Sequence, residues 1–214
     1  MELAADGNGP SSGSLGSSSG GRPRGRPRSV GKHRAILDAA VELVGERGVL
    51  GVTVEAIAAR AGVGKASVYR RWASKIPLVI EAVEEAAERQ VPVPDLGNLR
   101  DDLEAMFRSF VVAVQMPLGR AIARLMLDAR VDADLARAVK QGLMLQRHGP
   151  VRLMIERAID RGEVRSGVDI DLVLHMGIAV VLHRLIVLGE GLDERLAGEL
   201  SDLIMDGVGT RNRQ

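Results

Sequence analysis

Apolar residues recur every three or four positions along most of the chain from residue 32 onward, which is the period of an amphipathic helix. No stretch alternates apolar and polar residues with the two-residue period of a half-buried strand. Because Gly and Pro punctuate the periodic stretches, the sequence predicts an all-α protein. Pro150 should kink or split one of the expected helices, because proline has no N–H to donate. These helices cover residues 32–47, 54–61, 65–72, 75–90, 98–115, 117–130, 133–161, 169–189 and 193–207.

The segment between residues 53 and 72 has the order of signals that a helix-turn-helix requires. Thr53 is suited to cap the second helix, and Gly62 suits a sharp turn because a positive φ costs glycine little. In the short helix that follows, Val68 and Trp72 lie four residues apart and anchor one face in the core. The other side then presents Lys65, Ala66, Ser67, Tyr69, Arg70 and Arg71.

This short basic helix has the chemistry of a DNA-reading element. The unpaired N–H groups of a helix N-terminus suit phosphate, and arginine can contact guanine with two hydrogen bonds. Small side chains such as Ala66 and Ser67 allow close approach to base edges. A solvated basic face on an ordinary helical bundle is the alternative interpretation. The capped helix and the glycine turn that precede it favour DNA binding.

Charge is unevenly distributed along the chain, although the net charge is only +1. Residues 21–80 hold twelve Lys or Arg against four acids, whereas residues 81–214 hold seventeen against twenty-two. Such asymmetry is typical of a chain in which one segment meets a polyanion. Residues 1–20 are rich in Gly and Ser, a composition that cannot offset the entropy of ordering.

A basic arm, GRPRGRPRS at residues 21–29, precedes the first helix. It should be extended, because each proline disfavours helix at the residue before it. Within it, Arg24-Gly25-Arg26-Pro27 resembles the core of an AT-hook, whose two arginines, Arg24 and Arg26 here, enter a narrow A·T minor groove. The alternative is a flexible cationic arm that only attracts phosphates.

One pattern of residues runs through the segment 34–80: Ile36–Leu37–Ala39–Ala40, Gly48, Thr53, Ile57–Ala58, Ala61–Gly62–Val63, Val68–Tyr69 and the ending from Trp72 to Lys75. With this pattern, residues 34–80 resemble the N-terminal domain of the TetR/AcrR family of bacterial transcriptional repressors. The resemblance implies an α-helical homodimer with N-terminal DNA-binding heads and a C-terminal bundle for dimerisation and ligand binding. It also implies that Tyr69 and Lys75 contact phosphates, that Thr53 is a backbone-contacting cap, and that Lys65 to Ser67 read bases.

Three regions are expected: a tail and arm at 1–30, a helix-turn-helix domain at 31–80, and a helical ligand-binding and dimerisation domain at 81–214. The junction is VPVPDLG at residues 91–97. Residues 176–189 are apolar nearly all round, as expected of a helix buried between its own domain and a partner. Together with residues 193–207 they could form half of a four-helix interface repeated by two-fold symmetry.

An apolar ligand pocket is a family-level expectation for a set of adaptable side chains. Taken one by one, the Met and Phe residues are better explained as ordinary core, and the histidines as interfacial or surface residues. The candidates are Met106, Phe107, Phe110, Met126, Met144, His148, Met154 and His175.

The sequence holds no cysteine, so disulfides and thiolate metal sites are excluded. His175 and His183 lie eight residues apart on one expected helix, roughly 12 Å along its axis, which is too far to share one Zn²⁺. No catalytic constellation stands out, so we expect no enzyme, no metal and no cofactor. Asp101–Asp102 and Glu84–Glu85 are expected on solvated helix faces. No apolar run approaches the roughly 18 residues of a membrane span, so a cytoplasmic protein is expected.

We therefore expect a ligand-responsive, homodimeric repressor that binds a pseudo-palindromic DNA operator and is released by a small hydrophobic or amphipathic effector. Its two recognition helices would occupy successive major grooves, roughly 34–36 Å apart or more. The alternative is an effector-independent architectural protein that coats A·T-rich DNA through its basic arm. Competition binding separates the two, because a specific operator should outcompete bulk DNA by about a thousandfold or more.

Overall fold

The computed structural model describes residues 27–209, apart from the side chains of residues 27–29, 143–148 and 174. Helices account for nearly all of its regular structure, and within residues 27–209 the extended pairing is a single isolated bridge between Val164 and Gly209. The first four helices are α1 (Pro27–Arg47), α2 (Val54–Arg60), α3 (Lys65–Tyr69) and α4 (Lys75–Gln90). The rest are α5 (Leu99–Gln115), α6 (Pro117–Asp128), α7 (Ala133–Val139), α8 (Leu145–Asp160), α9 (Ile170–Leu182) and α10 (Arg195–Val208), with π-helical turns η1 (Lys140–Met144) and η2 (His183–Leu188).

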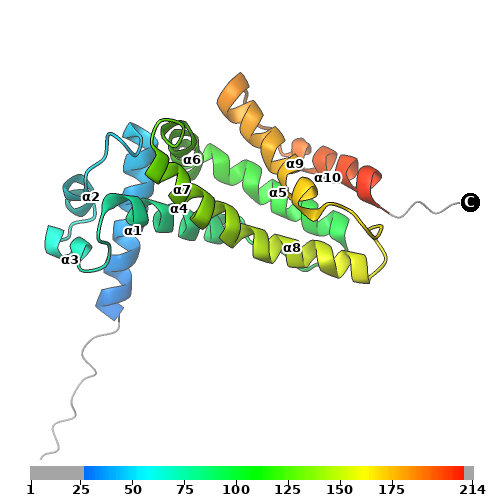
Figure 1. The fold of residues 1–214 in the computed structure, drawn as a ribbon, viewed down its shortest axis with the longest axis horizontal. Coiled ribbons are helices and arrows are strands. Elements are labelled where there is room, and N and C mark those ends of the chain that lie inside the picture. The colour runs from blue at the N-terminus through cyan, green and yellow to red at the C-terminus, as the bar shows by residue number, and fades with distance from the viewer. Residues whose placement is uncertain (1–26, 210–214) are drawn as a thin grey trace, which may run out of the picture.

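Helices α1, α2 and α3 form one end of an elongated molecule, and α4 leads from them into a bundle made of α5 to α10 (Figure 1). Helix α1 packs against both α4 and α6, and α5 packs against α6 and α10. The N-terminal helices therefore contact the rest of the protein through two separate helices, α4 and α6.

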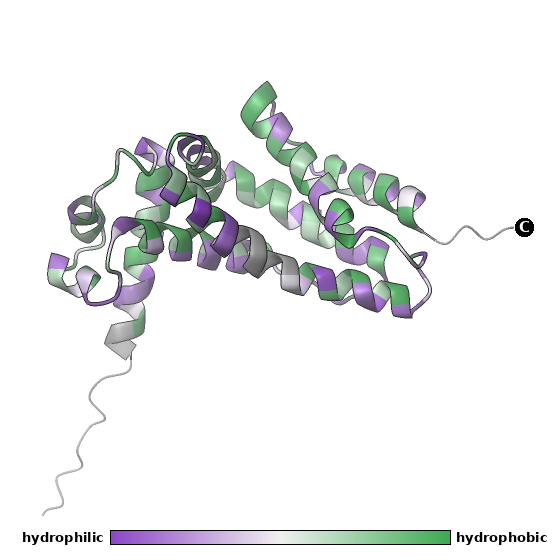
Figure 2. Cartoon of the chain, viewed as in Figure 1, coloured by the Kyte–Doolittle hydropathy of each residue, from purple (hydrophilic) through white to green (hydrophobic). Residues whose placement is uncertain are grey.

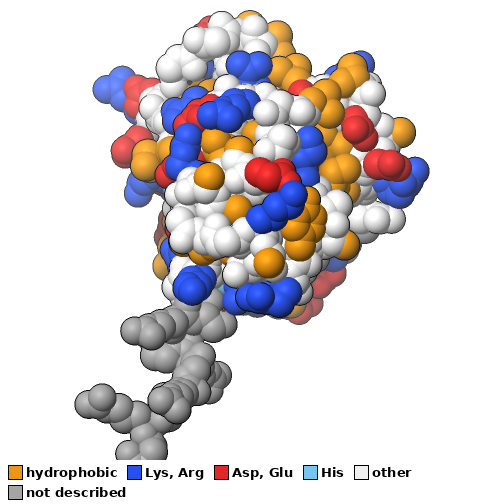
Figure 3. Space-filling view, turned by 90° about the vertical axis from the view of Figure 1, so that its left-hand side faces the viewer, with side chains coloured by type: hydrophobic (Ala, Val, Ile, Leu, Met, Phe, Trp, Pro, Cys, Tyr) orange, Lys and Arg blue, Asp and Glu red, His pale blue; other side chains and the backbone are white. Residues whose placement is uncertain are grey.

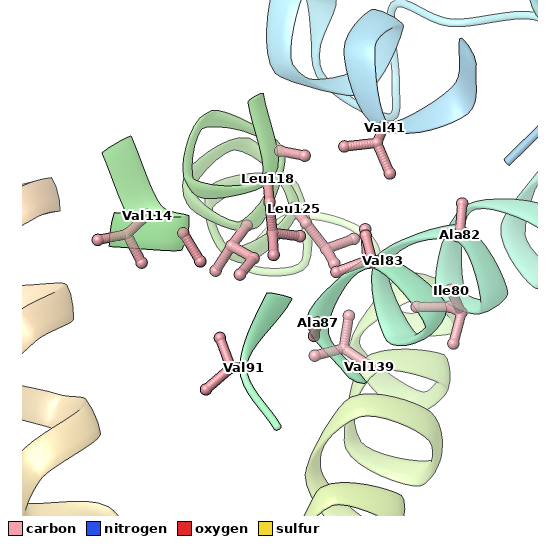
Figure 4. Close-up of a cluster of buried hydrophobic side chains, with 14 of the residues drawn as sticks. Val41, Ile80, Ala82, Val83, Ala87, Val91, Val114, Leu118, Leu125 and Val139 are labelled. Carbon is pink, nitrogen blue, oxygen red and sulfur yellow. The ribbon is translucent and has the colours of Figure 1, made fainter. Parts of the chain in front are cut away.

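The apolar core runs through this junction without interruption. Val41 of α1 points toward Leu118 and Leu125 of α6 and toward Val83 of α4, and Val139 of α7 lies beneath α4 (Figure 4). All five side chains are buried. Because protein interiors are close-packed, a shift of α6 relative to α4 must be felt by α1.

Two expectations about the ends of the first helices were wrong. Helix α1 begins at Pro27, so residues 27–29 are helical and not extended; proline at the first helical position lacks only an N–H that the helix does not use. Helix α3 ends at Tyr69, and the N–H groups of Arg71 and Trp72 both bond back to the carbonyl of Val68 in a tightened final turn. Residues 21–26 of the basic arm lie outside the described residues.

The long helix expected over 133–161 is interrupted at η1 and not at Pro150, which lies inside α8. At the interruption Gly142 lies against α4, where a Cβ would collide with the side chains of Glu84 and Ile80. A larger residue would therefore have to displace these side chains. The irregular turn thus coincides with a tight contact between η1 and α4.

Two acids that were expected in solvent are partly or wholly inside the protein. Asp102 is buried, and its Oδ1 accepts a 2.6 Å hydrogen bond from the N–H of Leu96 in the α4–α5 connection. The Oε1 atom of Glu84 is buried beneath η1 without a hydrogen-bond partner. Burial, and then the charges of Glu88 and Glu81, raise the pKa of Glu84. Sequence periodicity places these acids on helices but does not show what covers them.

The expectation that no apolar segment is long enough to cross a membrane was also wrong. Helix α9 and η2 together form a 19-residue apolar helix, Ile170–Leu188, that is long enough by length and composition, and only 18% of it is buried. Helices α5 and α6 also pass the same test jointly, although they are bent by 81°. The far end of Ile170–Leu188 stands clear of the other helices and is strongly hydrophobic (Figures 1 and 2).

We expect Glu84→Gln to stabilise the protein at neutral pH. Because the pKa of Glu84 is raised on folding, its charged form opposes folding above that pKa, and this penalty fades as the pH falls through it. The thermal midpoint at pH 7 should rise by about 2 °C, a small gain because the carboxylate is only partly desolvated. At pH 4 the variant and the parent should melt together. Glu156→Gln, at an exposed position of α8, is the control; a lower midpoint for Glu84→Gln at pH 7 would contradict the expectation.

Candidate nucleic-acid interface

Helices α2 and α3 are joined by a turn whose geometry follows from its residues. The Thr53 hydroxyl caps α2 by accepting a 3.2 Å hydrogen bond from the N–H of Ala56. Gly62 has a φ of +64°, which residues with a side chain rarely adopt, and Val63 then bonds back to the carbonyl of Ala58. The predicted cap and the predicted turn are both confirmed.

Helix α3 is oriented by one buried face. Val68 and Trp72 are buried, as their four-residue spacing predicts. The indole Nε1 of Trp72 donates a 2.6 Å hydrogen bond to Glu81 of α4, and the Trp72 ring stacks on His33 of α1 at 5.4 Å between centroids. Contacts to α1 and α4 therefore fix a helix of five residues, which is too short to be stable alone.

The opposite face of α3 is open to solvent. Lys65, Ala66, Tyr69, Arg70 and Arg71 are exposed, and Ser67 is half-buried. Arg70 donates a 3.2 Å hydrogen bond to the hydroxyl of Ser67, so these two side chains are already in contact. At this end of the molecule Lys and Arg side chains lie among acidic and apolar ones and do not form an unbroken basic surface (Figure 3).

An acid that the sequence analysis did not single out lies on the same surface. Glu55, in the first turn of α2, forms an ion pair with Lys65. The hydrogen bond between them lowers the pKa of Glu55 and raises the pKa of Lys65. The Lys65 ammonium also lies 5.4 Å from the centroid of the Tyr69 ring, within cation–π range.

The loop between α1 and α2 is clamped from two sides. The Oδ2 atom of Asp128, at the end of α6, accepts hydrogen bonds from the N–H groups of Val49 (2.6 Å) and Leu50 (3.2 Å). The Lys75 ammonium, at the start of α4, donates to the carbonyls of Val49 (2.7 Å) and Val52 (3.0 Å). Two helices thus hold the backbone that leads directly into the Thr53 cap. Asp128 gives no local sequence signal, because it lies 79 residues from the amide that it binds.

Gly48 permits this clamp. Its φ is +72°, and a Cβ at this position would come 2.7 Å from the Asp128 carboxylate. Lys75, expected to contact phosphate, is half-buried and faces the loop carbonyls in this structure. Its expected phosphate contact stays a prediction, as do Arg24 and Arg26, which lie outside the described residues.

The predicted ligand residues do not converge on one cavity. Met106, Phe107 and Met154 are buried core residues, and Phe110 and Met126 pack against that core. Phe107 packs directly against Gly177 of α9, where a Cβ would collide with its ring. His175 is exposed, with Nδ1 2.5 Å from the carbonyl oxygen of Asp171. The side chains of Met144 and His148 are among those not described.

An open hollow of about 490 Å³ lies elsewhere on the bundle. It is lined mainly by α5, and none of the six predicted ligand residues whose side chains the structure describes lines it. The described residues hold no group of three or more His, Asp or Glu side chains arranged to bind a metal ion. The lining residues are Gln90, Arg108, Ser109, Val112, Ala113, Met116 and Glu194.

A capped helix, a glycine turn and a short helix with one buried and one basic face define the class of helix-turn-helix DNA-binding proteins. Two family descriptions match this chain. "Bacterial regulatory proteins, tetR family" matches residues 36–82, and "Tetracyclin repressor-like, C-terminal domain" matches residues 93–204. The chain belongs to the TetR family of transcriptional regulators.

Individual relatives agree with this assignment. The uncharacterized HTH-type transcriptional regulator YdeS of Bacillus subtilis is 30% identical over 86% of this chain and 91% of its own. The DNA-binding transcriptional repressor TetR of Mycobacteroides abscessus is 31% identical over 85% of this chain and 94% of its own. Regulators of this family are usually repressors and are not enzymes.

Solved structures share the fold over most of the chain. The TetR family transcription regulator SCO0332 has a TM-score of 0.69 and 31% identity, covering 84% of this chain and 99% of its own. The transcriptional regulator FadR from Bacillus subtilis, solved in complex with stearoyl-CoA, has a TM-score of 0.65 and 19% identity. Its match covers 81% of this chain and 97% of FadR.

We expect Asp128→Ala to destabilise the protein, because the buried N–H of Val49 loses its charged acceptor. An unsatisfied buried donor costs about 1–3 kcal/mol, which corresponds to a thermal midpoint lower by about 2–10 °C. Asp128→Asn keeps one acceptor oxygen and should lose less. Asp134→Ala, at an exposed position of α7, is the control. Equal melting of Asp128→Ala and the parent would show that the clamp contributes nothing.

Proposed function

We propose that this regulator binds a pseudo-palindromic DNA operator as a homodimer, with α3 of each subunit in the major groove. The observation that carries the proposal is the two-sided α3. Its buried Val68 and the following Trp72 hold it rigidly, while Lys65, Ala66, Tyr69 and Arg70 face solvent. Two such helices on a two-fold axis reach grooves roughly 34–36 Å apart, or a multiple of this.

The roles within the site follow from the side chains. Lys65, Ala66 and Ser67, at the N-terminal end of α3, approach base edges, and Arg70 and Arg71 supply further cationic contacts. The Thr53 hydroxyl accepts from Ala56 and donates to the Glu55 carboxylate in this structure, and on DNA the same O–H turns to donate to phosphate. The Tyr69 hydroxyl also donates to phosphate. Lys75 binds the loop carbonyls and contacts a phosphate from the same position, and Arg24 and Arg26 of the arm add contacts beside the operator.

Dimerisation accounts for the exposed apolar surface of α9, η2 and α10. Regulators of this family dimerise, and a second copy of the chain is the partner that an isologous interface requires. Covering this surface would remove the apolar face that could otherwise enter a membrane, as suits a regulator that acts in the cytoplasm, where its DNA lies. The large side chains exposed there are Leu172, Met176, Ile178, Val180, Val187, Leu188 and Leu203.

A small hydrophobic or amphipathic effector releases the regulator from DNA in this proposal. The hollow of about 490 Å³ is within the range of small-molecule sites, and Val112 and Met116 give it apolar walls. FadR, which shares the fold, was solved with stearoyl-CoA, a ligand with a long apolar chain. The effector must bind one arrangement of the bundle more tightly than the other, because only differential affinity shifts an equilibrium.

The test of DNA reading begins by selecting bound fragments from genomic DNA. Lys65→Ala and Ser67→Ala should then alter the selected sequence, with a cost of roughly tenfold in affinity for the parent operator. Tyr69→Phe should weaken binding to all sequences similarly, because a phosphate contact carries no sequence information. If both α3 variants select the parent sequence, α3 does not read bases.

The test of dimerisation uses Leu203→Asp, which places a charge on the exposed apolar surface. Sedimentation should show monomers, and operator affinity should fall by about a hundredfold or more because the second half-site no longer adds to the first. Leu96→Asp changes an equally exposed leucine in the α4–α5 connection and should leave the dimer intact. A Leu203→Asp protein that remains dimeric would place the interface elsewhere.

A further inference from the structure

An acidic side chain on a surface that meets DNA is unexpected, because phosphates repel it. Glu55 is the only acidic residue between Gly48 and Lys75, the segment that holds α2, the turn and α3. Its side chain is 51% exposed, and besides Lys65 its carboxylate accepts hydrogen bonds from its own N–H and from the Thr53 hydroxyl at the start of α2. The other acids that pair with α2, Glu42 and Glu46, belong to α1 and bind Arg60.

The position of Glu55 is tied to the first residue of α3. Its carboxylate pairs with the Lys65 ammonium, whose side chain is 56% exposed, and the same ammonium lies over the Tyr69 ring. Lys65 is therefore held between an acid and an aromatic ring when no DNA is present. In this arrangement its charge is largely neutralised and does not point freely toward a phosphate.

We propose that Glu55 is a specificity-determining residue, which withholds Lys65 from phosphates and accepts a hydrogen bond from the N4 amine of a cytosine at the operator. This inference rests on the proposed placement of α3 in the major groove. Carboxylates accept from cytosine N4, whereas lysine donates to O6 and N7 of guanine. The ion pair between Glu55 and Lys65 can open without loss of binding free energy only where Glu55 meets a cytosine N4 amine and Lys65 meets guanine O6 or N7.

The same pair weakens binding to other sequences. On non-specific DNA the closed pair contributes no net charge, so Lys65 releases no counterion there. At a wrong base the carboxylate of an opened pair would face acceptor atoms such as N7 or O4, which repel it. Glu55 thus raises the ratio of specific to non-specific affinity by penalising competitors, in addition to any attraction that it supplies.

The experiment compares Glu55→Gln with the parent protein on the selected operator and on bulk DNA over a range of salt concentrations. Gln keeps the shape of Glu and removes its charge. Non-specific affinity should rise, and the salt slope on bulk DNA should increase by about one unit, because Lys65 becomes available to phosphate. The specificity ratio should fall by about tenfold, with relaxed selection of cytosine at one position in each half-site.

Two further variants make the test specific. Glu46→Gln removes a comparable exposed acid that pairs with Arg60, and it should leave the salt slope and the selected sequence as in the parent. Lys65→Gln should leave the salt slope on bulk DNA unchanged, and adding Glu55→Gln to it should no longer raise that slope. Thermal unfolding of each variant verifies that the head remains folded.

The failures of the two proposals are distinguishable. If Lys65→Ala changes the selected sequence while Glu55→Gln leaves both slope and selection unchanged, Glu55 has no part in specificity and α3 still reads DNA. If Glu46→Gln raises the slope as much as Glu55→Gln, the effect is one of general charge and the inference is overturned. If neither Lys65→Ala nor Ser67→Ala alters DNA binding, the placement of α3 fails and this inference fails with it.

Discussion

The clamp on the α1–α2 loop is the constraint on which the position of the DNA-binding surface depends. Asp128 of α6 binds N–H groups of this loop and Lys75 of α4 binds its carbonyls, so both hydrogen-bonding edges of one short backbone segment are occupied. Hydrogen bonds to charged groups are roughly twice as strong as neutral ones. Because the loop leads into the Thr53 cap, the direction of α2, and through the Gly62 turn that of α3, is set jointly by α4 and α6. A change in the spacing of α4 and α6 must move this loop or break one of these bonds.

The stability of helix α3 comes mostly from its contacts with other helices and little from the helix itself. Five residues cannot nucleate a stable helix in water. The helix exists because Val68 is buried and because Trp72 is held by Glu81 and His33. The contacts of Val68 and Trp72 with the core, α1 and α4 orient the helix. Its opposite side therefore stays exposed to solvent.

The local parts of this site could be predicted from the sequence, and the distant parts could not. Thr53, Gly62 and Trp72 act through neighbours a few residues away, so their spacing alone indicates a cap, a turn and an anchor, and each is found in that role. Asp128 acts on a loop far away in the chain, and Glu84 is covered by η1, which only the packing of the bundle brings to it. Periodicity shows which residues form a helix and one of its faces, but not which distant segment covers a given side chain. For the same reason the predicted ligand residues divided between core and surface.

The composition of the apolar helix Ile170–Leu188 suits either a bilayer or a protein partner. The arrangement of its residues favours a protein partner. Val173, Gly177 and Val181 follow one buried stripe at four-residue spacing, so the helix already uses one face against its own bundle. On the adjoining α10, exposed Leu203 lies between exposed acids, Asp202 and Asp206. An apolar centre with a charged rim is typical of an interface between proteins, whereas a bilayer would have to desolvate those acids. The surface therefore fits a second copy of the same helices, which would bring a matching apolar centre and leave both charged rims in water.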